Sequence, residues 1–132
     1  MSICIYLVLL SSVINNRTHS VKSMSNENID SIFDFIDRTS SNRNIRVSFY
    51  GGESLLHFPF IKMTVAKGYA RWGSGVVFAI STNGTLLTEE VIDWLVENRV
   101  ECAVSIDGPA EFHDKYRTDV GGVGSFARIY KA

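Results

Sequence analysis

The chain has little cysteine and almost no excess charge, and each scarcity excludes a class of protein. Two of its 132 residues are cysteines, Cys4 and Cys102, which are too few for a disulfide scaffold and do not form a close pair that could bind zinc. This cysteine usage predicts a cytoplasmic protein. The formal net charge is -1, so neither nucleic acid nor a membrane surface is an expected partner. With 45% hydrophobic residues, the composition is that of one folded domain.

The amino terminus carries an apolar run that begins at Ile3 and ends at Leu10. No lysine or arginine precedes the run, and it is well short of the roughly 20 residues that cross a bilayer. A buried strand is therefore favoured over a targeting segment. The polar residues 15–22 that follow predict a loop.

Farther along the chain, helical and β-rich segments alternate at intervals of about 25 to 30 residues, the length of one βα unit. Helices are expected to begin near Ser25, Pro59 and Thr88, because serine and threonine cap helices and proline suits a first turn. Strands are expected at 45–49, 76–80 and 100–106. This alternation predicts an α/β fold of parallel βα repeats.

Hydrophobic periodicity assigns a buried face to each expected helix. In the first helix, Ile29, Ile32, Phe33 and Ile36 fall at i, i+3, i+4 and i+7. The near-continuous apolar run at 76–80 indicates a strand that helices cover on both faces. The buried residues expected in the other two helices are Ile61, Val65 and Ala66, and Ile92, Leu95 and Val96.

Polar, glycine-containing loops follow the three later strands, at 51–54, 81–84 and 105–108. Each loop alone is ordinary turn chemistry, but parallel strands bring all three to one edge of the sheet, where α/β folds bind ligands. A site for a small polar ligand is therefore predicted. Within it, Glu53 is placed either to orient backbone groups or meet an amine, or to act as a first-turn helix acid.

Three ordered motifs occur from residue 43 to the carboxyl end. They are FYGGESLL at 49–56, STNGTLL at 81–87, and a longer one made of SIDGP at 105–109, HDKYR at 113–117 and GSF at 124–126. In order and spacing they resemble the radical S-adenosylmethionine (radical SAM) enzymes, in the branch of sulfatase-maturating enzymes and SPASM-type peptide maturases. One departure is Ser54, which stands where that branch usually has proline. The resemblance implies a partial, TIM-like radical SAM barrel.

The same resemblance implies a set of ligand-binding residues. Gly51, Gly52 and Glu53 would meet the amino group of S-adenosylmethionine, Thr82 and Asn83 would line its pocket, and Ser105 and Arg117 would hold its ribose and carboxylate. A guanidinium suits a carboxylate because the two form parallel hydrogen bonds.

Two neighbouring residues have other expected roles. For Asp107, ligand contact and turn support are both left open. His113 is expected to form hydrogen bonds within its loop rather than to bind a metal, because no second histidine lies at ligand spacing.

The radical SAM branch uses a Cys-x-x-x-Cys-x-x-Cys loop after its first strand to hold a 4Fe-4S cluster, and this chain departs from that pattern. Between Met1 and Gly51 the one thiol is Cys4, while Cys102 falls within an expected strand and is interpreted as a small core side chain. No catalytic or metal-ligating residue is therefore predicted. The chain alone is expected to be inactive.

This departure fits either a fragment of a longer gene, whose start is lost or read in another frame, or a degenerate relative that keeps the pocket without the chemistry. Residues 1–132 are expected to be one partial radical SAM core domain, in which 1–24 are an atypical apolar start and loop, and 43–132 carry the family motifs. A fragment of an oxidoreductase that modifies a protein or peptide substrate is favoured. The alternatives are an inactive fragment, or a degenerate α/β module that binds a nucleotide-like ligand without reacting it.

Overall fold

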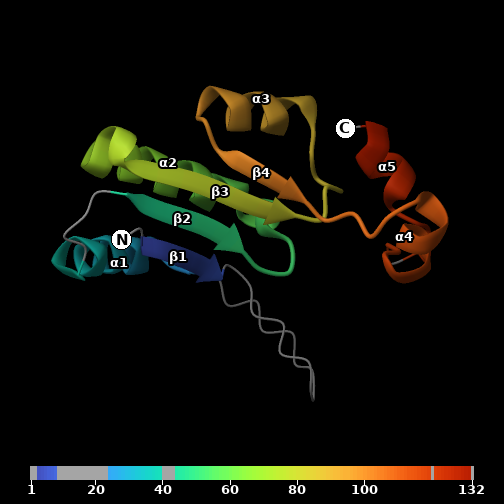
Figure 1. Ribbon diagram of the computed structural model, residues 1–132, viewed down its shortest axis with the longest axis horizontal. Helices are drawn as coiled ribbons and strands as arrows, with labels where there is room; N and C mark the ends of the chain where they lie inside the picture. The colour runs from blue at the N-terminus through green and yellow to red at the C-terminus, as the bar shows by residue number, and fades with distance from the viewer. Residues whose placement is uncertain (1–2, 9–23, 40–43, 120, 132) are drawn as a thin grey trace, which may run out of the picture.

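Four strands form one parallel sheet at the centre of this computed structural model (Figure 1). Their order in the sheet is the order of the chain, and each strand is parallel to the next. The structure describes residues 3–8, 24–39, 44–119 and 121–131. The strands are β1 (Ile3–Val8), β2 (Ile45–Tyr50), β3 (Val76–Thr82) and β4 (Glu101–Val104). The predicted α/β fold of parallel βα repeats is confirmed, including a strand in the apolar amino terminus. The loop predicted at 15–22 lies outside the described residues.

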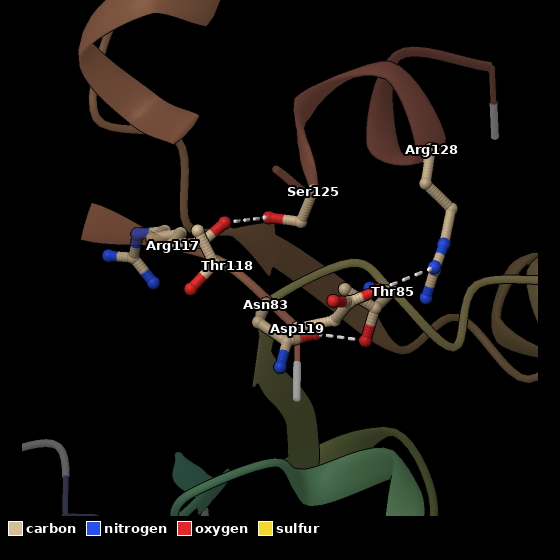
Figure 2. A pocket seen from close by; sticks show the side chains of 7 residues that line it. All are labelled: Asn83, Thr85, Arg117, Thr118, Asp119, Ser125 and Arg128. Atoms are coloured by element: carbon tan, nitrogen blue, oxygen red, sulfur yellow. Dashed lines mark hydrogen bonds and ion pairs between the residues drawn. The ribbon is translucent and has the colours of Figure 1, made fainter. Parts of the chain in front are cut away.

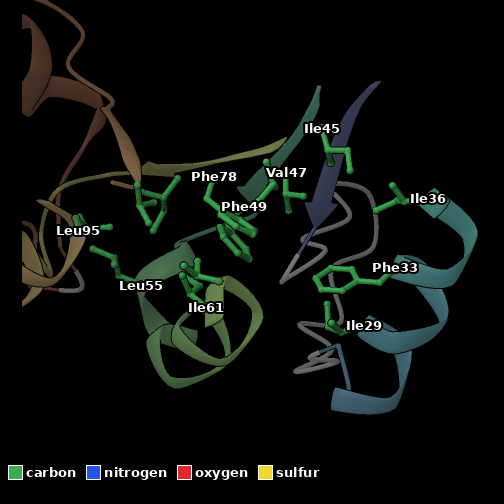
Figure 3. Packing of buried hydrophobic residues seen from close by; sticks show 14 residues of the cluster. Ile29, Phe33, Ile36, Ile45, Val47, Phe49, Leu55, Ile61, Phe78 and Leu95 are labelled. Carbon is green, nitrogen blue, oxygen red and sulfur yellow. The ribbon is translucent and has the colours of Figure 1, made fainter. Parts of the chain in front are cut away.

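Three helices connect the strands and pack against one face of the sheet (Figure 3). They are α1 (Asn26–Thr39), α2 (Phe58–Trp72) and α3 (Glu89–Glu97). When the strand order in the sheet follows the chain, right-handed crossovers place all the connecting helices on the same face of the sheet. Two 3-10 turns, η1 (Ser54–His57) and η2 (Gly73–Gly75), lie on either side of α2. Beyond the carboxyl end of the sheet lie α4 (Ala110–Tyr116) and α5 (Phe126–Lys131) (Figure 1).

The core lies between the sheet and these three helices. In α1, Ile29, Phe33 and Ile36 are buried as predicted, and Thr88 caps α3 by accepting a hydrogen bond from the Val91 N–H at 3.3 Å. Two predicted core residues are wrong. Ala66 is exposed, because the buried face of α2 contains Ile61, Thr64, Val65 and Gly68, and Val96 is 72% exposed, because Val91, Trp94 and Leu95 form the inner face of α3.

The other face of the sheet differs from the prediction. Along β3, Val76, Phe78 and Ile80 are buried, but Val77, which points to the opposite face, is 39% exposed. In the part of the chain that the structure describes, helices cover β3 on one face and not on both. On the open face, the guanidinium of Arg46 in β2 pairs with the carboxylate of Glu101 in β4, across β3.

Close packing between α2 and β3 depends on a glycine, and this yields a first prediction. A Cβ atom on Gly68 would lie 2.4 Å from the Phe78 ring, which is buried and contacts the rings of Phe49 and Tyr69. Gly68→Ala is expected to lower the free energy of unfolding by about 1–3 kcal/mol, because the core must be overpacked to accept the methyl group. Urea unfolding followed by circular dichroism measures this change.

The matched control is Gly52→Ala, since no atom lies within 4 Å of a Cβ built there. Its effect is expected to be under about 0.5 kcal/mol. Equal effects of the two substitutions would contradict the packing argument.

Candidate functional site

The three polar loops predicted to share a site do lie together, at the carboxyl ends of β2, β3 and β4. The N–H of Ser105 donates to the carbonyl oxygen of Thr82 at 2.9 Å, which joins the second and third loops. Gly84 has a φ of 81°, and a Cβ there would lie 2.9 Å from Val104 and 3.0 Å from Ile129. Glycine at this position therefore allows the second loop to pass close to β4 and α5.

Glu53 joins the first loop to the second. Its buried carboxylate accepts three hydrogen bonds: Oε1 from the Leu55 N–H (3.0 Å) and the Thr82 hydroxyl (2.7 Å), and Oε2 from the Asn83 N–H (2.8 Å). We call this group of four residues the Glu53 clamp. Of the roles predicted for Glu53, capping η1 and orienting backbone groups are both observed.

Ser54 follows the clamp and is fully buried. Among the described residues, its Oγ is the one buried side-chain oxygen or nitrogen with no hydrogen-bond partner. Burying a hydroxyl without a partner costs free energy. This cost falls at the position where the family that the sequence resembles has proline.

Arg117 and Asp107 form a bidentate ion pair across ten residues of sequence. Arg117 Nε lies 2.5 Å from Asp107 Oδ2, and Nη2 lies 3.0 Å from Oδ1. The hydrogen bond from Arg117 lowers the pKa of Asp107, and the reciprocal bond raises the pKa of Arg117. The pair is therefore charged at neutral pH. Asp107 thus orients Arg117, a role that neither of the two expected ones includes.

His113 is fully buried in α4 and hydrogen-bonds at both ring nitrogens. The Asp107 N–H donates to Nδ1 at 3.3 Å, so the ring proton is assigned to Nε2, which donates to Ser125 Oγ at 2.9 Å. The predicted hydrogen bonding of His113 is confirmed, but the residue lies in a helix and not in a loop, and its partner Ser125 is twelve residues away. Ser125, which the sequence prediction did not include, donates in turn to the carbonyl oxygen of Arg117 at 3.0 Å.

A polar pocket of about 380 Å³ lies at this edge of the sheet (Figure 2). Of the predicted residues, Asn83 and Arg117 line it, whereas Thr82 is buried in the clamp. The predicted residues that are not among its lining are Gly51, Gly52, Glu53, Thr82, Ser105 and Asp107. The lining residues that sequence reasoning missed are Thr85, Thr118, Asp119, Ser125 and Arg128.

Two of the missed residues had a usable signal. Ser125 belongs to a motif that the sequence already singled out, and Arg128 lies about one helical turn beyond it in α5. Asp119 stabilises the turn between α4 and α5, because its carboxylate accepts hydrogen bonds from the N–H groups of Gly121 (2.9 Å) and Val123 (3.0 Å). The same carboxylate lies 3.6 Å from the guanidinium of Arg128. The pocket thus combines two guanidinium groups and the carboxylate of Asp119 with amide and hydroxyl groups, and its lining has more positive than negative side chains. This suits a polar ligand with an anionic group.

The described residues do not offer a metal site. No group of three or more histidine, cysteine, aspartate or glutamate side chains in the described part could hold a metal ion. The interpretation of Cys102 as a core side chain is wrong: the residue is exposed, because β4 is an edge strand with little cover. Nearby protein atoms still remove part of its hydration, and this desolvation, with the charge of Glu53, raises the pKa of the Cys102 thiol. None of the described helices is long and apolar enough to cross a membrane.

The fold and the pocket are those of an α/β protein: a parallel sheet with helices on one face and a polar pocket at the carboxyl ends of the strands. The chain is similar to a solved structure described as native anSMEcpe with bound AdoMet and Kp18Cys peptide, at 26% identity and a TM-score of 0.81 over 99% of this chain and 39% of that one. A second solved structure, a histidine-tagged anSMEcpe with bound AdoMet, has a TM-score of 0.82 at 22% identity, over 97% of this chain and 37% of that one.

Curated proteins are also similar to this chain in sequence. A serine-type anaerobic sulfatase-maturating enzyme of Bacteroides thetaiotaomicron is 36% identical over 129 residues, which are 96% of this chain and 30% of that protein. A cysteine-type anaerobic sulfatase-maturating enzyme from Clostridium novyi is 31% identical, over 89% of this chain and 32% of that protein. No protein-family model matches. The chain is therefore similar to anaerobic sulfatase-maturating enzymes, and it spans about a third of the length of these relatives.

The Glu53 clamp yields a second prediction. Glu53→Gln is expected to lower the free energy of unfolding by about 1–3 kcal/mol. Both carboxylate oxygens accept hydrogen bonds, so the NH₂ group of glutamine must replace one of them and face an N–H or O–H donor. Urea unfolding measures the change. The exposed Glu111 in the first turn of α4 provides the control, Glu111→Gln, with an expected effect within about 0.5 kcal/mol. A Glu53→Gln chain as stable as this control would show that the clamp contributes little.

The buried hydroxyl of Ser54 yields a third prediction, of opposite sign. Ser54→Ala is expected to raise the free energy of unfolding by up to about 1 kcal/mol, because it removes an unpaired buried hydroxyl. Thr82→Val serves as the control, since it removes a buried hydroxyl that has two partners, Glu53 and the Gly84 N–H, and should lower stability. If both substitutions lowered stability equally, Ser54 Oγ would have a partner after all.

Proposed function

We propose that this chain is a core segment of a radical SAM sulfatase-maturating enzyme and that it binds S-adenosylmethionine. The observation that carries the proposal is the pocket at the strand ends, where Asn83 and Arg117 lie at the positions that the family motifs assign to the ligand. Its volume is at the low end of the roughly 300–1,000 Å³ of small-molecule sites. The AdoMet present in the similar solved structures supports the same ligand.

Arg117 can hold the ligand carboxylate while it stays paired with Asp107. A guanidinium has five N–H donors, and the ion pair with Asp107 uses two of them, one on Nε and one on Nη2. The remaining N–H groups are available to a ligand carboxylate, and Asp107 fixes the plane in which they lie. In this proposal Ser105 meets the ribose, and Gly51, Gly52 and Glu53 meet the amino group.

The strand order supports a partial TIM-like barrel within 1–132 as one core domain. In such a barrel the helices lie outside and the inner face of the strands carries no helix, as is the case for the open face that holds Arg46 and Val77. The peptide present in one similar structure supports a protein or peptide substrate for the whole protein. A cytoplasmic location is part of this proposal, supported by the free thiol of Cys102.

The residues present do not fit the 4Fe-4S cluster of the family. Such a cluster needs three thiolates from one loop, whereas this chain has Cys4 in β1 and the exposed Cys102 at the far edge of the sheet. The side chain of Cys4 lies outside the described residues. No step of radical chemistry is therefore assigned to this chain. A second candidate function follows from the same observation: an α/β module that binds the nucleotide-like ligand without reacting it.

Cluster chemistry provides the fourth prediction. Anaerobic reconstitution of the chain with iron and sulfide is expected to give no stoichiometric 4Fe-4S spectrum, because the sequence lacks the three thiolates. Absorption and electron paramagnetic resonance spectra check this. A stoichiometric cluster that disappears in Cys4→Ser would contradict it and would place a cluster ligand in β1.

Ligand binding tests the proposed function itself and separates it from an inactive fragment. Isothermal titration with S-adenosylmethionine is expected to show one site. Arg117→Lys should weaken binding by roughly 10-fold or more, because an ammonium group cannot hold Asp107 and the ligand carboxylate in one plane. The matched control is Arg71→Lys in α2, whose side chain does not line the pocket and which should bind as the unmodified chain does. Absence of binding would reject the proposal.

A further inference from the structure

Arg117 belongs to a closed ring of four hydrogen-bonded residues, and the family motifs assign no role to this ring as a whole. The guanidinium of Arg117 pairs with the Asp107 carboxylate, and the Asp107 N–H donates to His113 Nδ1. His113 Nε2 is bonded to Ser125 Oγ, which donates to the carbonyl oxygen of Arg117. We call Asp107, His113, Arg117 and Ser125 the positioning ring.

The ring holds Arg117 at both ends. Ser125 fixes its backbone, because the Ser125 hydroxyl donates to the Arg117 carbonyl oxygen. Asp107 fixes its guanidinium, with 2.5 Å between Arg117 Nε and Asp107 Oδ2 and 3.0 Å between Nη2 and Oδ1. A free arginine side chain has many rotamers, and a ligand that must order it loses affinity. A guanidinium that is already ordered in the free protein avoids that loss.

His113 and Ser125 are buried at the hub of this ring, where they connect α4 to α5. His113 is fully buried and Ser125 is 8% exposed, so neither exchanges its hydrogen bonds readily with water. The ring of Phe126 lies edge-on to His113, with the two ring centroids 5.7 Å apart. In this environment His113 Nε2 and the Ser125 hydroxyl have one defined arrangement.

A second contact presses the start of α5 onto α4. Asp114 Oδ1 accepts from the Phe126 N–H at 2.9 Å, and a Cβ on Gly124 would lie 2.1 Å from Asp114 Cγ. The backbone at 124 can approach α4 this closely because it has no side chain. This approach brings Ser125 within reach of His113.

We propose that His113 and Ser125 are positioning residues for ligand binding: they act through Arg117, which they hold ready to receive the carboxylate of an amino-acid-bearing nucleoside. This inference rests on the proposed function. It predicts a selective effect, because a ligand without the carboxylate does not need an ordered guanidinium. S-Adenosylmethionine has that carboxylate, whereas 5′-methylthioadenosine shares the nucleoside and lacks the amino acid part.

The experiment titrates both nucleosides into the full chain and into Ser125→Ala, Ser125→Thr and His113→Phe variants. Ser125→Ala removes the hydroxyl's hydrogen bonds to His113 and to the Arg117 carbonyl oxygen. It is expected to weaken S-adenosylmethionine binding by roughly 10-fold and to change the affinity for 5′-methylthioadenosine by less than about twofold. Ser125→Thr keeps the hydroxyl and should restore affinity. His113→Phe keeps the ring and removes both hydrogen bonds, so it should match Ser125→Ala. The control is Ser31→Ala on the exposed side of α1.

If Ser125→Ala weakened the binding of both nucleosides equally, or of neither, the positioning role would be overturned. If the unmodified chain binds neither nucleoside, the proposed function fails, and a readout without ligand then decides on the ring. Trypsin must extract the Arg117 side chain to cut between Arg117 and Thr118, so Ser125→Ala should speed that cut roughly threefold or more without changing the cut after Arg71. An unchanged rate would overturn the positioning ring by itself.

Discussion

The buried carboxylate of Glu53 is the interaction on which the edge of this sheet depends. A carboxylate removed from water must have hydrogen-bond partners, and Glu53 obtains three from two separate loops. The requirement works in both directions: the loop after β2 cannot move without leaving the charge unpaired, and neither can the loop after β3. Because Asn83 is held through its own N–H, the clamp also sets the position of a pocket residue.

The strand order constrains what lies beyond this edge. Parallel strands in sequential order direct every strand end to one side, and the described helices cover one face of the sheet and not the other. The chain that leaves β4 at Val104 continues through α4 to the pocket. The second wall of the pocket is formed by residues 117–119 and Ser125, between α4 and α5, and by Arg128 of α5 (Figure 2). One wall of the pocket is thus fixed by the sheet and the Glu53 clamp. The other is fixed by the positioning ring.

The parts of this arrangement that could be predicted from the sequence are those of short range. The buried stripe of α1 depends on a few neighbouring residues, whereas the exposure of Val77 depends on which helices cover β3, and an apolar run looks the same whether one face is covered or two. The contacts of the site are also of long range. The partners of Glu53 lie 29 and 30 residues away, and the pairing of Asp107 with Arg117 depends on the path of the chain through α4, which no periodicity encodes. Sequence patterns therefore identified the charged groups, and the fold determined their partners.

Among the residues that the structure describes, no cysteine takes part in the hydrogen bonds that shape the two walls of the pocket. The Glu53 clamp uses residues of the loops after β2 and β3, and the positioning ring uses residues after β4. Neither includes Cys4, Cys102 or any residue before Glu53. The walls of the pocket are therefore held by carboxylate, hydroxyl, imidazole, guanidinium and backbone groups. The described geometry of the pocket does not require a thiol.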